Sequence, residues 1–147
     1  MTTRLMITGT LILCLGAGAA LADDPPQIIR QGLMKQIAGA MGTLSAIAKG
    51  QKPYDPVVVE GALTTIATDA KDFPGHFPEG SETGNGTEAS PAIWQNMADF
   101  VAHADKLSVT AEAQLAALPA DPAAVAKSMQ AIGANCGACH QLYRVSN

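Results

Sequence analysis

The sequence predicts an all-α protein folded as an antiparallel, up-down-up-down four-helix bundle, and three observations support this fold class. First, apolar residues recur at spacings of three and four residues, which is typical of helices that pack in bundles. Second, no segment alternates apolar and polar residues as a half-buried strand would. Third, a capping residue directly precedes proline at four helix starts: Asp24-Pro25, Asp55-Pro56, Ser90-Pro91 and Asp121-Pro122.

The first two predicted helices follow Asp24 and Asp55. In each, one face is apolar at helical spacing, so it is predicted to face the core. The first helix has Leu33, Ile37, Ala40, Leu44 and Ile47 on this face. The second has Val59, Leu63, Ile66 and Ala70.

The third and fourth predicted helices follow Ser90 and Asp121 and show the same periodicity. The third has Ile93, Met97, Phe100, Ala104, Leu107 and Ala111 on its apolar face. The fourth has Val125, Met129, Ile132, Cys136, Cys139 and Tyr143. Both cysteines are therefore predicted to face the core.

Short connectors at residues 50–54 and 119–120 predict that the helices they join are antiparallel neighbours. The connector at residues 73–89 is longer and rich in proline and glycine. This composition predicts an irregular surface loop.

Residues 1–22 have the pattern of a cleaved secretory signal peptide. Arg4 is followed by an apolar stretch over residues 5–18 and by the small-x-small site Ala20-Leu21-Ala22. The apolar stretch is shorter than the roughly 20 residues of a membrane-spanning helix. We therefore expect export to the periplasm and a mature chain, residues 23–147, that forms one domain.

The charge of the chain is mildly acidic. The formal net charge is −4, and it becomes −5 when Arg4 leaves with the signal peptide. This balance argues against nucleic acid or an anionic membrane as a partner, and it suits a basic partner protein.

The two cysteines of the mature chain lie in a single motif, Cys136-Gly-Ala-Cys139-His140, because Cys14 is lost with the signal peptide. On a helix, two thiols three residues apart face the same side and can form thioethers with the two vinyl groups of a haem. His140 then presents a ring nitrogen to the iron. The motif predicts one c-type haem (heme c) per chain, bound by two thioethers.

Two other kinds of site compete with haem for this motif. A redox dithiol belongs at the start of a helix after a strand, whereas this motif lies late in the last helix. A structural zinc site needs four ligands, and His76 and His103 are too far apart to act as a second pair on one helical turn.

The motif and its surroundings resemble the class II c-type cytochromes, which include the cytochromes c prime. The resemblance starts from Cys136-Gly-Ala-Cys139-His140-Gln-Leu-Tyr143-Arg144 at the end of a four-helix chain, and it spans essentially the whole mature sequence. The other matching segments are Arg30 followed by Met34, residues 48–55 (Ala-Lys-Gly-Gln-Lys-Pro-Tyr-Asp), residues 77–81 (Phe-Pro-Glu-Gly-Ser) and residues 91–94 (Pro-Ala-Ile-Trp).

The residue on the iron face opposite His140 decides the function, because an open face binds gases and a filled face mainly passes electrons. Bundle geometry leaves Met34, Met97 and His76 as candidates. Met129 and Met41 are more typical of core residues, Met41 being roughly 10 Å farther along the first helix than Met34. The periodicity does not choose between Met34 and Met97.

The resemblance does choose, because Met34 matches the distal ligand of the low-spin members of class II. It implies a periplasmic electron carrier with His/Met ligation. No enzyme activity is expected, because neither cysteine of the motif is free and the other histidines have no nearby catalytic partner in the sequence. The alternative is a high-spin, pentacoordinate cytochrome c prime that binds NO or CO at an open face. Electron exchange would involve periplasmic or membrane-bound redox proteins, and relatives imply a homodimer formed through the first two helices.

Two arginines are candidate haem contacts. Arg30 lies one turn before Met34, where it either reaches a haem propionate or lies on a solvated helix face. Arg144 lies one turn after His140, where it either covers the proximal edge of the haem or complements the helix dipole. Trp94 and Tyr143 are placed near the haem by the resemblance alone.

Overall fold

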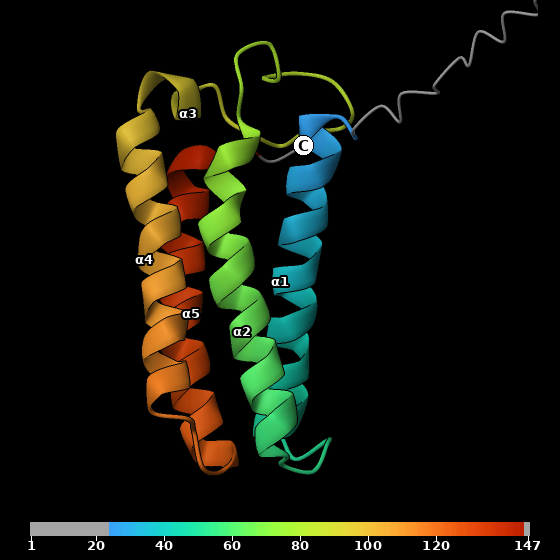
Figure 1. Ribbon diagram of the computed structural model, residues 1–147, viewed down its shortest axis with the longest axis vertical. Coiled ribbons are helices and arrows are strands. Elements are labelled where there is room, and N and C mark those ends of the chain that lie inside the picture. Colours follow the sequence, from blue (N-terminus) through green and yellow to red (C-terminus); the bar gives the residue numbers. More distant parts are fainter. Residues whose placement is uncertain (1–23, 146–147) are drawn as a thin grey trace, which may run out of the picture.

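The computed structural model describes residues 24–145, which form an up-down-up-down four-helix bundle (Figure 1). The predicted signal peptide lies outside these described residues. The described chain contains no strand, only an isolated bridge between Ala89 and Arg144. The long helices are α1 (Pro26–Ala48), α2 (Pro56–Asp72), α4 (Met97–Ala116) and α5 (Pro122–Tyr143), and the short ones are the 3-10 helix η1 (Phe73–His76) and α3 (Ala92–Gln95).

Each long helix packs on two neighbours, so that α1, α2, α4 and α5 surround one core. The core positions predicted on α1 and α2 are all confirmed, since none is more than 9% exposed. Burial of a Val, Leu or Ile side chain stabilises the fold by about 1.5–3 kcal/mol. No helix in the described part of the chain is long and apolar enough to cross a membrane.

The predicted capping residues are confirmed for α2 and α5. The side chain of Asp55 accepts a hydrogen bond from the backbone N–H of Val57 at 2.9 Å, and Asp121 accepts one from Ala124 at 2.8 Å. The first predicted start is wrong by one residue, because α1 begins at Pro26 and no side chain caps it. Pro26 takes the first helical position, so the preceding Pro25 occupies the N-cap and its carbonyl accepts the first helical bonds.

Replacing Asp121 by alanine is expected to lower the free energy of unfolding by about 1 kcal/mol, because the orphan N–H of Ala124 loses its acceptor. Urea denaturation measures this loss. Asp121→Asn is the matched control, since asparagine caps helices about as well as aspartate. An equal loss in both variants would assign the effect to charge and contradict the capping role.

The third predicted helix is interrupted, which the periodicity did not show. It consists of α3 and α4, separated by Asn96 with φ −135° and ψ 48°. The side-chain amide of Asn96 donates to the carbonyl of Ala92 at 3.4 Å. Asparagine favours such local bonds over helix continuation. The third predicted start is wrong by one residue, because α3 begins at Ala92 and Pro91 is its N-cap. Ser90 Oγ still accepts a hydrogen bond from the N–H of Ala92 at 3.2 Å.

The connector at residues 73–89 is not simply a surface loop, so this prediction is wrong in part. It begins with η1, and the remainder, residues 77–89, crosses the end of the bundle (Figure 1). We call residues 77–89 the strap. Phe77 is 5% exposed and Ser81 is 3% exposed, so the strap is anchored in the protein interior. Long-range contacts that the local composition does not encode bury these two side chains.

A second cluster of buried side chains lies beneath the strap. Phe77, Ile93, Phe100 and Tyr143 form it, with Phe73 and Trp94 packed against it. The ring of Phe100 lies 4.7 Å from Phe77 and 5.4 Å from Tyr143 between centroids, both edge-on. These contacts join the strap, α4 and α5 at the end of the bundle that also holds the cysteine motif.

Candidate functional site

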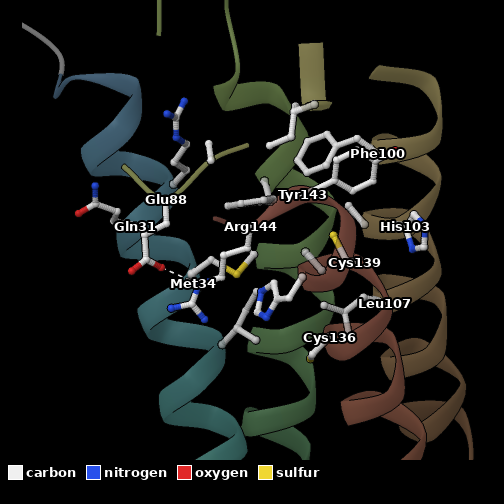
Figure 2. A pocket seen from close by; sticks show the side chains of 18 of the residues that line it. Gln31, Met34, Glu88, Phe100, His103, Leu107, Cys136, Cys139, Tyr143 and Arg144 are labelled. Atoms are coloured by element: carbon white, nitrogen blue, oxygen red, sulfur yellow. Dashed lines mark hydrogen bonds and ion pairs between the residues drawn. The ribbon is translucent and has the colours of Figure 1, made fainter. Parts of the chain in front are cut away.

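The end of α5 presents Cys136, Cys139 and His140 to one cavity of about 550 Å³. This size lies within the usual range for ligand and cofactor pockets. The wall is mostly apolar, and it comes mainly from α1, α4, α5 and the strap, with single residues from α2, η1 and α3 (Figure 2). Its apolar side chains include Met34, Ile37, Met41, Phe73, Phe77, Ile93, Phe100 and Leu107.

The two thiols are poor nucleophiles where they lie. Burial raises the pKa of Cys136, and burial with the nearby charges of Cys136 and Asp99 raises the pKa of Cys139 to about 11. A reactive dithiol needs the opposite shift, toward the thiolate. The environment of the pair therefore does not fit thiol-disulfide catalysis.

The imidazole of His140 favours its neutral form. Desolvation at the cavity wall lowers its pKa first, and the positive charge of Arg144 lowers it further, against an opposing effect of Glu88. A histidine must be deprotonated to bind a metal. The site therefore presents a lone pair to an iron without the need to remove a proton near neutral pH.

The distal candidates separate clearly in the structure. Met34 lines the cavity from α1, as Figure 2 shows, whereas Met97 and His76 are not among its lining residues. Met97 packs against the aromatic cluster, and the ring of His76 pairs with Asp72 at 3.0 Å. Met41 both packs against the core and lines the cavity, while Met129 packs against the core alone, as expected.

Arg30 also lines the cavity but does not lie on a solvated face of α1. It is 3% exposed, so that interpretation is wrong. Burial lowers its pKa, and Glu82 opposes the shift. An arginine nevertheless stays charged in a protein, so this wall of the cavity carries a positive charge.

Arg144 follows the last residue of α5 and forms an ion pair at the edge of the cavity. Its Nε lies 2.6 Å from Oε2 of Glu88, which belongs to the strap (Figure 2). The backbone runs alongside, since the N–H of Val145 donates to the carbonyl of Glu88 at 2.9 Å. Because both side chains of the pair are partly exposed, the pair itself adds little stability.

The resemblance placed Trp94 and Tyr143 near the site, and their positions differ. Tyr143 lines the cavity, and its hydroxyl donates to Asp99 at 2.6 Å, a bond that raises the pKa of the tyrosine to about 12. Trp94 lies behind the wall, against Phe77. Sequence reasoning missed the roles of Asp99 and Glu88, because neither belongs to a local motif and both act across more than forty residues.

The donors present fit a covalently bound haem better than a structural zinc ion. Two thiols and a neutral imidazole face a mostly apolar cavity large enough for a cofactor. Between residues 24 and 145 there is no group of three or more His, Cys, Asp or Glu side chains suitable for a metal ion. A four-ligand zinc site is therefore not supported in this part of the chain.

Comparison with known proteins agrees with this geometry. The family model described as cytochrome c' matches residues 27–144. A cytochrome c-556 from Agrobacterium fabrum is 51% identical over 145 residues, 99% of this chain and 97% of the relative. Another from Agrobacterium tumefaciens strain II Chrys is 59% identical over 116 residues, 79% of this chain and 93% of the relative.

Solved structures show the same fold. Cytochrome c' from Rhodopseudomonas palustris superposes with a TM-score of 0.79 at 31% identity, covering 85% of this chain and 99% of that one. A nitric oxide complex of a cytochrome c prime variant from Alcaligenes xylosoxidans gives 0.70 at 27% identity, covering 84% and 98%. The chain therefore belongs to the cytochrome c' family of class II c-type cytochromes, which are electron-transfer haem proteins.

Proposed function

We propose that the chain carries one c-type haem, attached through thioethers to Cys136 and Cys139, with His140 and Met34 as axial ligands. Its role is to transfer electrons, with no substrate chemistry. The observation that carries this proposal is that Met34, from α1, lines the same cavity as His140, from α5, whereas Met97 and His76 do not. Two neighbouring helices thus bring the thioether of Met34 and the imidazole of His140 to the same cavity.

The chain tunes the bound group through its surroundings. When bound, the haem iron supplies one-electron chemistry between Fe(II) and Fe(III). The thioether of Met34 favours the reduced state and raises the potential. The apolar wall limits access of water, and Arg30 adds a buried positive charge to the wall of the cavity.

The second candidate is an open iron that binds NO or CO. One observation favours it, namely the similarity to a cytochrome c prime variant solved with nitric oxide. In this case Met34 would fill space on the distal side without a bond to iron. The two candidates differ in the spin state of the iron and in its response to CO.

Replacing Met34 by alanine is expected to abolish the sulfur-to-iron absorption band completely, convert the iron from low to high spin, and allow CO to bind. Visible spectra of the oxidised and reduced holoprotein, with and without CO, measure all three changes. Met97→Ala is the matched control, since it removes a methionine outside the cavity and should leave the spectra unaltered. A high-spin wild-type spectrum with ready CO binding would favour the open iron instead.

We also propose that residues 1–22 direct the chain to the periplasm, where it exchanges electrons with periplasmic or membrane-bound redox proteins. The acidic balance of the mature chain supports a basic partner rather than nucleic acid. Homodimer formation through α1 and α2 is proposed from the family resemblance. Analytical ultracentrifugation of the exported holoprotein tests it, with a monomer at micromolar concentration as the contrary result.

A further inference from the structure

The guanidinium of Arg30 donates hydrogen bonds to η1 and to the strap. Nη1 donates to the carbonyl of His76 at 3.3 Å and to Oγ of Ser81 at 3.1 Å. Nη2 donates to the carbonyl of Ser81 at 2.7 Å and to Oγ1 of Thr87 at 2.7 Å. Four of the five N–H donors of this side chain therefore point at η1 and the strap, and only Nε–H is left for another partner.

Aromatic rings complete the environment of Arg30. Its guanidinium carbon lies 4.7 Å from the ring centroid of Phe77 and 5.7 Å from that of Trp94. Planar guanidinium groups stack well on aromatic faces, which lysine does not reproduce. The side chain thus holds both the polar and the apolar parts of the strap.

Two glutamines extend the same contact along α1. Nε2 of Gln27 donates to the carbonyls of Ser81 and Thr83 at 3.3 and 2.9 Å, and Nε2 of Gln31 donates to the carbonyl of Asn85 at 2.9 Å. Positions 27, 30 and 31 lie on one face of the helix at spacings of three and four. Three side chains on one face of α1 therefore donate hydrogen bonds to the strap.

The strap in turn forms part of the cavity wall. Residues 86–89 line the cavity, beside the ion pair of Glu88 with Arg144. The strap has few turns of its own, such as the bonds from the N–H of Ser81 to Pro78 and from Thr87 to Gly84. Its shape over the cavity therefore depends on the bonds from α1, chiefly those of the buried guanidinium, together with the contacts of Glu88 with Arg144 and Val145.

We propose that Arg30 is a positioning residue, which fixes the strap to α1 and so keeps water out of the haem cavity, rather than a direct ligand of a haem propionate. The inference rests on the proposed function in one respect, that the cavity holds a haem. Exclusion of water favours Fe(II) over the more highly charged Fe(III), so a loosened strap lowers the reduction potential. Loss of the positive charge of Arg30 acts in the same direction, and the test must separate the two effects.

The test uses the holoprotein and three variants. Arg30→Gln removes the charge and most of the bonds. Ser81→Ala/Thr87→Val retains the charge and removes two of the acceptors. Lys106→Gln, on the exposed face of α4 outside the cavity, is the charge control. Hydrogen exchange of the strap amides and the midpoint potential of the haem are measured for each.

Amide exchange at Ser81 and Thr87 is expected to accelerate at least about tenfold in Arg30→Gln, and by a smaller factor in the double variant. Ala89 is compared in Arg30→Gln alone, because its N–H donates to Oγ1 of Thr87 at 3.2 Å. The potential should fall in both, and neither quantity should change in Lys106→Gln. A potential that falls in Arg30→Gln without faster strap exchange would overturn the proposal, because the lost charge alone would then account for the fall. The proposal would also be overturned if the double variant had the same strap exchange rates and the same midpoint potential as the wild-type protein.

These outcomes are independent of the iron ligation. The wild-type spectrum decides between a sulfur-ligated iron and an open iron, and strap exchange is measured in either case. Failure of the proposed function is therefore seen in the wild-type protein, whereas failure of the present inference is seen only in the differences between variants.

Discussion

Haem will no longer be held covalently when Cys136 and Cys139 are both replaced by alanine. Each thioether needs one thiol, and both described thiols line the cavity beside His140. We expect complete loss of covalent haem from the double variant. Mass spectrometry of the denatured chain measures it, since wild-type protein retains the mass of one haem after unfolding.

The single variants provide the internal control for this experiment. Cys136→Ala and Cys139→Ala each keep one thiol, so each can keep one thioether and the haem mass. Haem that stays attached to the denatured double variant would contradict the assignment. If the denatured wild-type chain lacked the mass of one haem, the assignment of the chain as a c-type haem protein would be contradicted.

Replacing Phe100 by alanine is expected to lower the free energy of unfolding by about 3–5 kcal/mol, the usual cost of removing a fully buried aromatic side chain. Phe100 is 1% exposed, and its ring contacts those of Phe73, Phe77 and Tyr143. The loss combines less apolar burial with a cavity that the cluster cannot fill. Urea denaturation of the holoprotein measures it.

Two variants calibrate this result. Phe100→Leu keeps much of the apolar volume and should lose less stability than the alanine variant. Val109→Ala lies on the same helix at a side chain that is 61% exposed, and it should change stability by less than about 0.5 kcal/mol. A loss below about 1 kcal/mol for Phe100→Ala would show that the aromatic cluster does not stabilise this end of the bundle.

Local chemistry accounts for the parts of the fold that were predicted correctly. Asp55 and Asp121 cap their helices because the capping bond reaches only two or three residues ahead. The break at Asn96 was missed because the apolar period continues across it. A period records which side chains face the core, and it does not record a change of direction in the backbone between them.

The residues of the candidate site likewise fall into those that a local motif predicts and those that depend on distant contacts. The haem-attachment motif from Cys136 to His140 could be predicted because the spacing of its residues on one helix is enough to identify it. The solvated position considered for Arg30 was wrong, since its acceptors Ser81 and Thr87 lie more than fifty residues away. Helical periodicity relates residues three or four positions apart, so it cannot predict a contact between residues more than fifty positions apart.

The sequence by itself determined the bundle, its core faces and the haem-attachment motif, because helix periodicity, capping and the spacing of two thiols act within a few residues. Only the tertiary structure decided that Met34, and not Met97, lines the cavity with His140, and that the charge of Arg30 is buried. The physical reason is that both depend on how α1, α5 and the strap pack together. The relative position of segments far apart in the chain follows from the packing of the whole core.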